Sequence, residues 1–108
     1  MEILEYLAID GRSPFRTWFD GLDATAAAKV TVAIERMRLG NLAGSKGVGG
    51  GVLEHRLDFG PGYRIYFGKD GTSLVILLAG GTKQRQQTDI QTARARWADY
   101  KQRKKGAR

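Results

Sequence analysis

The sequence predicts an α+β fold with the element order β-α-α-β-β-β-α: a small, twisted, largely antiparallel sheet with a helical hairpin on one face and a C-terminal helix. Three observations lead to this prediction. Residues 52–79 form three strand-like runs separated by two glycine-containing turns. Residues 13–39 carry apolar side chains at helical spacing, and residues 88–100 resume that spacing after a glycine pair. The rest of the chain is organised around the three-stranded meander.

The meander is defined by alternation and by turn residues. Residues 52–59 alternate apolar and charged side chains with a period of two, which is typical of a half-buried strand. The GPG turn at 60–62 leads into a second strand at 63–68. The dipeptide Asp70-Gly71 predicts a two-residue hairpin turn before a third strand at 73–79. That third strand is apolar almost throughout, as expected of a strand covered on both faces.

These turns imply a register. A three-residue GPG loop sets Asp58 opposite Arg64 and Arg56 opposite Tyr66. Because side chains alternate, Arg56, Arg64 and Tyr66 then share one face. The opposite face carries the expected core set of Leu57, Ile65 and Phe67. The charged face is either a platform for an RNA phosphate and a stacked base or the site of an ordinary cross-strand pair between Asp58 and Arg64.

Length and composition restrict the class of protein. A chain of 108 residues suffices for one domain with one modest core. We expect this domain at 1–100, followed by a basic tail at 101–108. The sequence has no cysteine, one histidine, no apolar run long enough to cross a membrane, and no basic start of a secretion signal. We therefore expect a cytoplasmic protein without disulfides, a metal site, a cofactor or a membrane partner.

The charge balance indicates a polyanionic partner. The net charge is +7, which favours nucleic acid, a ribosome or an acidic protein surface. Residues 94–108 hold seven Lys or Arg and one acidic residue, Asp99. This basic end is either a solvated terminus or a contact to RNA. The candidate residues for contact with RNA or the ribosome are Lys46, Arg94, Arg96, Lys101, Arg103, Lys104 and Lys105.

The helices have recognisable starts. A first strand is expected at 2–8, and Ser13 followed by Pro14 predicts a capped helix start. Asp23 can cap a second helix over 24–39. Thr88 with Gln91 forms a capping box at which the last helix is expected to begin. The expected buried stripes are Phe15, Trp18, Phe19 and Leu22, then Ala27, Val30, Ile34 and Met37, and finally Ile90, Ala93, Trp97 and Tyr100.

Two other features invite a functional interpretation. Residues 41–51 contain five glycines, but they lack the spacing of a phosphate-binding loop and do not precede a helix, so a connector is favoured. His55 shares the buried parity of Leu53 and Leu57, which favours a core or rim histidine over a catalytic one. Gly80-Gly81 is expected to break the sheet.

Two stretches, LEHRLDFGPGYRIYF and LVILLAGGTKQRQQTDI, together resemble the RelE/ParE superfamily of toxin–antitoxin toxins. The nearest subgroup is the HigB-like, phage-derived "addiction module killer" proteins. The motifs are VGGGV before the meander, GPGYR-x-YF between its strands, and GG-x-K-x-x-Q-x-x-DI entering the last helix. The resemblance covers nearly the whole chain.

The resemblance implies a site. Ribosome-dependent members cut mRNA without metal, by attack of a 2′-hydroxyl on the neighbouring phosphate. Arg64, in GYR, would bind that phosphate; Arg56 matches a basic residue on the preceding strand, and Lys83 with Gln84 or Arg85 occupies a cationic loop. RelE has a tyrosine early in its last helix, where this chain has Thr88-Asp89-Ile90, so Tyr66 is a candidate substitute.

Three functions follow from these expectations. The first is a toxin that inhibits translation as a ribosome-dependent mRNA endonuclease. The second is a ParE-like toxin that inhibits DNA gyrase by binding, which the missing tyrosine favours. The third is a non-toxic basic nucleic-acid-binding module. The resemblance further implies a small cognate antitoxin, typically with a helix-turn-helix domain, as partner, besides the ribosome and mRNA.

Overall fold

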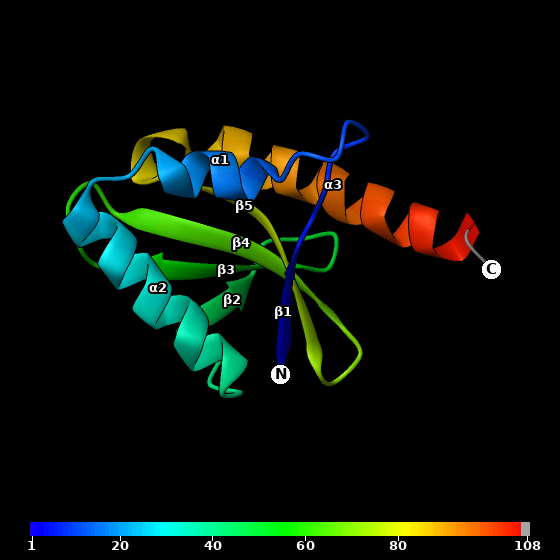
Figure 1. The fold of residues 1–108 in the computed structure, drawn as a ribbon, viewed down its shortest axis with the longest axis horizontal. Coiled ribbons are helices and arrows are strands. Elements are labelled where there is room, and N and C mark those ends of the chain that lie inside the picture. The colour runs from blue at the N-terminus through cyan, green and yellow to red at the C-terminus, as the bar shows by residue number, and fades with distance from the viewer. Residues whose placement is uncertain (107–108) are drawn as a thin grey trace.

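The computed structural model describes residues 1–106 as a mixed α+β fold with a five-stranded sheet and three α-helices, the last of them C-terminal (Figure 1). The α+β class predicted from the sequence is confirmed at this level. A short additional strand precedes the meander and was not predicted. The elements are β1 (Glu2–Glu5), α1 (Pro14–Asp20), α2 (Ala24–Arg38), β2 (Ser45–Gly47), β3 (Val52–Leu57), β4 (Tyr63–Asp70), β5 (Leu74–Thr82), the 3-10 helix η1 (Lys83–Arg85) and α3 (Gln86–Gly106).

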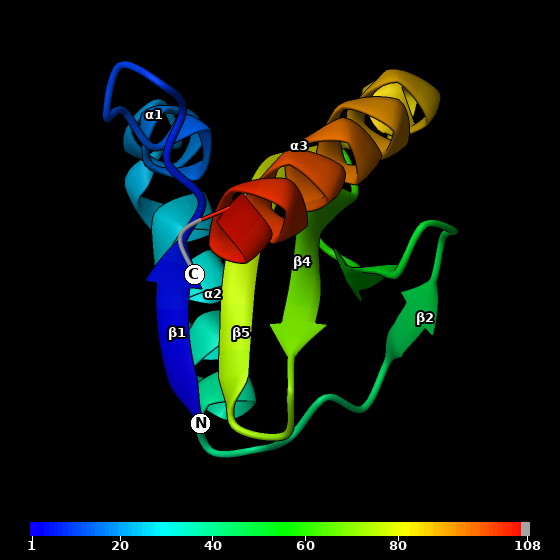
Figure 2. The same ribbon diagram turned by 90° about the vertical axis from the view of Figure 1, so that its right-hand side faces the viewer.

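The sheet has the strand order β1-β5-β4-β3-β2. The β1 strand runs parallel to β5, and the other pairs are antiparallel. Figure 2 shows α2 behind the sheet and α3 crossing in front of it. Each face therefore has its own apolar core. The α1–α2 face buries Phe15, Val30, Ala33, Met37, Ile65, Phe67, Val75 and Leu77, and the α3 face buries Tyr6, Val52, Tyr66, Ile76, Leu78, Ala79, Ala93 and Trp97.

The helix starts follow the predicted local chemistry. The Ser13 hydroxyl accepts a hydrogen bond from the backbone N–H of Arg16 at 3.0 Å. The Asp23 carboxylate accepts one from Ala26 N–H at 2.8 Å. Each interaction satisfies one of the free donors at a helix N-terminus. Both predicted caps are confirmed, and the predicted inner face of α3 packs on the sheet through Ala93, Trp97 and their neighbours.

The predicted register of β3 and β4 is wrong by two positions. Leu57, rather than Phe59, lies opposite Tyr63, and Arg56 lies opposite Arg64. The connecting loop therefore spans 58–62, because Phe59 leaves the sheet and stacks on Tyr63 with ring centroids 6.1 Å apart. A displacement by two keeps every side chain on its predicted face. Arg56, Arg64 and Tyr66 do share one face of the sheet.

The turn between β4 and β5 is also longer than predicted. Asp70 pairs with Leu74, so residues 71–73 form the turn. The ladder is irregular between Tyr66 and Phe67, and a β-bulge of this kind places an extra residue in one strand. Turn residues alone do not reveal such a bulge.

The boundary between β5 and α3 corrects two expectations. Gly80 and Gly81 do not break the sheet, since β5 continues to Thr82. A side chain at Gly80 would overlap the indole of Trp18, and one at Gly81 would overlap the carboxylate of Asp89, so both glycines admit a neighbouring side chain. The 3-10 helix then leads into α3 at Gln86, before the predicted start at Thr88.

The basic end continues α3 to Gly106 and is attached to the body of the protein by side-chain contacts. Arg103 donates hydrogen bonds to Leu7 O at 2.7 Å and to the Tyr6 hydroxyl at 2.9 Å. Lys104 pairs with Asp70, whose carboxylate also accepts a hydrogen bond from the Tyr100 hydroxyl. Residues 101–106 of the predicted tail are thus helical, and residues 107 and 108 lie outside the described residues. Within 1–106 no helix is long and apolar enough to span a membrane.

Candidate functional site

Charged residues from three strands meet on the α3 face of the sheet. In one cross-strand row Lys46 of β2 lies opposite Glu54 of β3, and Glu54 lies opposite Tyr66 of β4. In the next row Arg56 lies opposite Arg64. Residues directly opposite each other in a sheet have Cβ atoms about 5 Å apart. One carboxylate and three cations therefore share a small area at the β2–β3–β4 end of the sheet.

The Glu54 carboxylate is the centre of this cluster. The side chain is 1% exposed. Its Oε2 atom lies 3.6 Å from Arg64 Nε and accepts a hydrogen bond of 2.9 Å from Gln86 Nε2 at the start of α3. Its Oε1 atom lies 3.8 Å from Lys46 Nζ and is buried without a hydrogen-bond partner among the described residues. A buried charge requires such opposite charges and donors to be tolerated.

Arg64 links the cluster to the loop that follows β5. Its Nη1 atom donates to Gly62 O at 2.8 Å, and Lys83 N–H donates to the same carbonyl at 2.9 Å. Gly62 has φ of +79°, a conformation that favours glycine. The shared carbonyl brings η1 beside β4. The predicted residues Arg64 and Lys83, far apart in the sequence, thus become neighbours.

Arg64 and Tyr66 are covered, which corrects the expectation of an open platform. Arg64 is 2% exposed and Tyr66 is fully buried in the α3 core. Burial raises the pKa of Tyr66, and the nearby Glu54 carboxylate raises that pKa further. The phenol is therefore neutral near pH 7, and within residues 1–106 its hydroxyl has no hydrogen-bond partner. In this conformation Tyr66 cannot stack on a base.

Asp89 lies at the edge of the same cluster, against the backbone at Gly81. Burial raises the pKa of Asp89, and the positive charges of Arg85 and Arg96 oppose that shift. Its Oδ2 atom is buried and has no hydrogen-bond partner in the part of the chain that the structure describes. Glu54 and Asp89 are thus two neighbouring carboxylates in different environments. Glu54 has cations beside it, whereas the largest effect on the pKa of Asp89 is the loss of solvent around its carboxylate.

The accessible charge lies around the rim of the cluster. The Arg56 side chain is 54% exposed, although its Nε atom lies 3.5 Å from Asp58. The Lys46 side chain is 63% exposed. Lys83 and Arg85 are exposed on η1. A cationic rim therefore surrounds the buried pair of Glu54 and Arg64, and any polyanion reaches the rim first.

The remaining predicted RNA-contacting residues lie along α3. Arg94 packs on the glycine-rich loop, since a side chain at Gly50 would come within 3.1 Å of its Nε atom. Arg96 is half-buried and donates to Leu78 O at 2.8 Å. Lys101 lies 5.7 Å from the Trp97 ring centre, and Lys105 is exposed. The structure therefore separates the predicted set into a rim at the sheet and a basic stretch of α3.

Sequence reasoning missed Glu54 and Gln86. Alternation did place Glu54 on the face of Arg56, but it did not distinguish this carboxylate from the neighbouring charged positions. The available signal was one acidic residue on the same face as two arginines. Gln86 gave no signal, since the predicted helix began after it.

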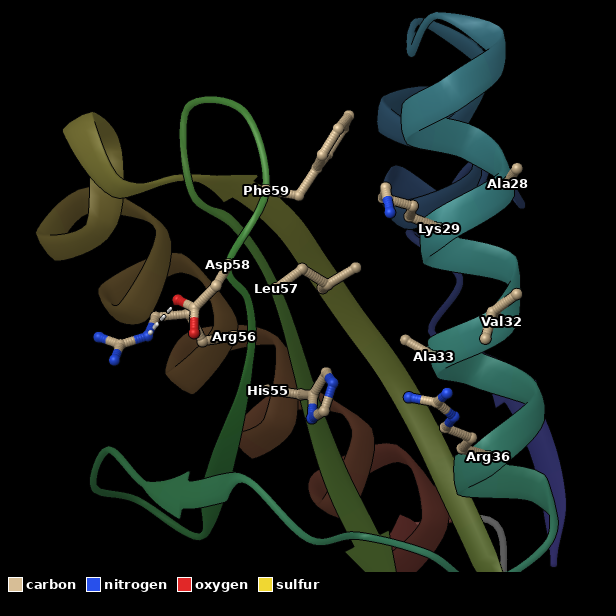
Figure 3. Close-up of a pocket in the computed structure, with 10 residues that line it drawn as sticks. All are labelled: Ala28, Lys29, Val32, Ala33, Arg36, His55, Arg56, Leu57, Asp58 and Phe59. Atoms are coloured by element: carbon tan, nitrogen blue, oxygen red, sulfur yellow. Dashed lines mark ion pairs between the residues drawn. The ribbon is translucent and has the colours of Figure 1, made fainter.

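A pocket lies on the opposite face of the sheet, between α2 and β3 (Figure 3). Its volume is about 490 Å³, and Lys29, Arg36, His55 and Phe59 are among the residues that line it. Figure 3 shows Arg56 and Asp58 pointing away from it. Burial and then the charge of Arg36 lower the pKa of His55. His55 is half-buried at the rim of the core.

The fold and the charged cluster define a small, basic α+β protein with a cationic site at one end of its sheet. Among residues 1–106, no group of three or more His, Cys, Asp or Glu residues is arranged to hold a metal ion.

The family model described as "phage derived protein Gp49-like (DUF891)" matches residues 17–98, and the chain belongs to this family, which is part of the RelE/ParE-like toxin superfamily. A protein of Haemophilus influenzae (strain Rd), described as an uncharacterized protein, is 41% identical over 81 residues, covering 74% of this chain and 82% of the relative. No solved structure matches the chain.

Proposed function

We propose that this protein is the toxin of a type II toxin–antitoxin system, of the HigB-like subgroup, and inhibits translation as a metal-independent, ribosome-dependent mRNA endonuclease. The observation that supports this most is the cationic rim around Glu54 and Arg64. The rim residues come from three separate segments that the fold brings together: Lys46, Arg56, Lys83 and Arg85. Membership of a toxin superfamily gives the rim its expected target.

The rim suits the charge that develops during RNA cleavage. Attack of a 2′-hydroxyl on the adjacent phosphorus forms a phosphorane with additional negative charge. Cations around that centre stabilise the transition state more than the ground state. The ribosome holds the mRNA in a conformation favourable for attack, so a small protein supplies only part of the catalytic machinery.

Arg64 has a supporting role in this proposal. It is buried behind the rim, so Arg56 and Lys83 contact the phosphate first. Arg64 adds a fixed positive charge from the interior, where water screens it less. Tyr66 remains a candidate only if the start of α3 moves.

A second function, inhibition of DNA gyrase by binding, has its own support. The burial of Arg64 and Tyr66 and the absence of a tyrosine early in α3 both favour a protein that binds without cutting RNA. For either toxin, the proposed partner is a cognate antitoxin that binds the basic surface which a net charge of +7 provides. The proposed site of action is the cytoplasm, with the ribosome and mRNA as targets of the endonuclease.

The experiment that tests the endonuclease is translation in vitro with primer-extension mapping of the message. The wild-type protein should produce cuts at fixed positions within codons, only when ribosomes are present. Arg56→Ala should lower the cleavage rate about 100-fold without unfolding the protein, because Arg56 is exposed. Arg12→Ala is the matched control, since the Arg12 side chain is 84% exposed and lies outside the cluster.

Uncut message, together with inhibition of DNA supercoiling by gyrase, would support the second function instead. A protein that neither cuts message nor inhibits gyrase, and that is harmless when expressed, would contradict both toxic functions. It would leave a basic nucleic-acid-binding module.

A further inference from the structure

The pocket of about 490 Å³ between α2 and β3 is a groove with two walls (Figure 3). The helix wall consists of side chains that recur at helical spacing and therefore share one side of α2: Lys29, Val32, Ala33 and Arg36. The other wall consists of side chains that alternate along the chain from β3 into the following loop and point towards the helix: His55, Leu57 and Phe59.

Positive charge lies at both ends of this groove. At one end Lys29 Nζ is 4.8 Å from the centre of the Phe59 ring. At the other end the charge of Arg36 is close enough to His55 to lower the pKa of the imidazole. Lys29 and Arg36 are seven residues apart on α2, which corresponds to about 10 Å along the helix axis. Within residues 1–106 neither cation has a carboxylate partner.

The middle of the groove is apolar. Val32 is 50% exposed, and Ala33 and Leu57 line the same stretch (Figure 3). Covering an exposed aliphatic side chain is favourable, and free cations favour a partner of opposite charge. The groove is therefore suited to a ligand that is apolar at its centre and negatively charged at two points on either side.

An amphipathic helix can present this pattern. Carboxylates seven residues apart lie on one face of a helix, about 10 Å from each other, and a residue three or four positions after the first lies between them. Such helices commonly bind by laying their apolar face into a groove. A second copy of this chain does not supply the pattern, because the acidic residues of its described helices are differently spaced: Asp20 in α1, Glu35 in α2, and Asp89 and Asp99 in α3.

A nucleic acid strand suits the groove less well. Its phosphates and sugars would lie against Val32 and Leu57, whose side chains have neither charge nor a hydrogen-bond donor. Single strands also bind by stacking bases on aromatic faces, and the Phe59 ring already contacts Tyr63 and Lys29. The exposed cations of the rim are on the opposite face of the sheet, and Figure 3 shows Arg56 pointing away from the groove.

We propose that this groove binds an acidic amphipathic helix of a partner protein. Two carboxylates of that helix, two turns apart, face Lys29 and Arg36, and an aliphatic side chain between them packs on Val32. The inference goes beyond the proposed toxin activity and does not depend on RNA cleavage. Because the groove and the cationic rim lie on opposite faces of the sheet, we expect the partner helix and an RNA strand to bind at the same time.

The first test uses a synthetic, alanine-based helical peptide of about 20 residues. It carries two glutamates seven residues apart and two leucines between them on the same face. In ¹H–¹⁵N NMR spectra of the wild-type protein, this peptide should cause saturable shifts in the amide signals of α2 and of residues 55–59. A peptide of the same composition, with its leucines on the face opposite the glutamates, should bind at least about tenfold more weakly, because its charged and apolar contacts cannot form together.

The second test uses substitutions in the groove. Lys29→Gln and Arg36→Gln should each weaken peptide binding about twofold to fivefold, because each removes one exposed ion pair. Val32→Asp should weaken it at least about tenfold, since it puts a carboxylate between those of the peptide. All three side chains are exposed, so the fold should be retained. Arg38→Gln is the matched control, because Arg38 is on the same helix but is paired with Glu35 and does not line the groove.

Three outcomes would overturn the proposal. One is equal peptide affinity of the wild-type protein and the double variant of Lys29→Gln with Arg36→Gln. Another is a set of NMR shifts confined to the rim, which would show that a protein of net charge +7 attracts any acidic peptide. The third is a single-stranded RNA that displaces the peptide and loses affinity in the same double variant, which would make the groove a nucleic-acid site.

The expected result with RNA is different. Single-stranded RNA should bind the peptide-saturated protein with unchanged affinity, and Arg56→Ala should weaken the RNA but not the peptide. Peptide binding is measured without ribosomes, so a failure of the proposed endonuclease and a failure of the groove are separate results.

Discussion

The packing of Trp97 against Gly68 gives the sharpest test of how α3 is held on the sheet. Trp97 is 5% exposed, and its ring lies directly on β4. A Cβ atom at Gly68 would come within 2.5 Å of Trp97 Cε3, so there is no room for a methyl group. Gly68→Ala should therefore destabilise the protein by about 1–3 kcal/mol through overpacking. Trp97→Ala should cost about 3–5 kcal/mol through the cavity it leaves.

The two changes should not be additive. In the double variant the alanine methyl group occupies space that the indole has vacated, so strain and cavity both decrease. The sum of the single effects is about 4–8 kcal/mol, and the double variant should lose less than that sum by at least about 1 kcal/mol. Urea unfolding followed by circular dichroism at one temperature gives all four free energies of the cycle.

Gly47 provides the matched control. It is also a strand glycine, but a Cβ atom there would have nothing within 4 Å. Gly47→Ala should change the free energy of unfolding by less than about 0.5 kcal/mol and should add to Trp97→Ala without coupling. Equal coupling at Gly47 and Gly68, or none at Gly68, would refute the direct packing of the ring on β4.

Three further predictions follow from the charged groups. Arg64→Ala should destabilise the protein by about 3–5 kcal/mol in urea unfolding, because it leaves a buried carboxylate poorly compensated, whereas Arg56→Ala should cost less than about 0.5 kcal/mol. The pKa of His55 is lower in the folded protein than in the unfolded chain, so the unfolded chain binds more protons just below neutral pH. The free energy of unfolding should therefore rise between about pH 5 and pH 7. In His55→Asn, thermal melts across that range should show a flatter rise. If the basic stretch of α3 contacts ribosomal RNA, Lys101→Gln with Lys105→Gln should weaken ribosome association and reduce the slope of log affinity against log salt by about 1–2; an unchanged slope would make that stretch a solvated helix end.

Local chemistry made much of the fold predictable. The caps at Ser13 and Asp23 depend on residues within one turn, and so does the spacing that places Ala93 and Trp97 on the inner face of α3. Such signals are complete within a few residues of sequence. The starts of β3 and β4 followed in the same way from alternation and glycine turns, but β3 ends two residues before its predicted end and β4 two residues after it.

The register was less predictable because it depends on contacts between separate segments. Phe59 continues the alternation of β3, yet it leaves the sheet to stack on Tyr63, while Lys29 of α2 lies 4.8 Å from its ring centre. Nothing within residues 52–62 indicates a contact with α2. The parity of the strand survived the error, so the face of each charged residue was still correct.

The candidate site was predictable in its residue types but not in its depth. Alternation assigns Glu54, Arg56 and Arg64 to one face without stating how much of that face a helix covers. Helix α3 crosses β4 and β5, and Gln86 at its start reaches Glu54. Arg64 therefore lies under cover, while Arg56, one strand further out, stays exposed. Depth also differs within β3, because Glu54 is buried and Arg56, two residues later on the same face, is exposed.

The glycines of the VGGGV motif help to position α3 over the charged cluster. A Cβ atom at Gly51 would come within 2.8 Å of Trp97 Nε1. The loop before β3 therefore packs against the same indole ring that lies on Gly68. The motif therefore affects the site through packing. Its glycines leave room for the Trp97 ring, and Trp97 packs α3 against the sheet. The start of α3 in turn covers the Glu54 carboxylate beside its cations. The burial of Glu54 thus depends on glycines of the loop before β3 as well as on the cations beside the carboxylate.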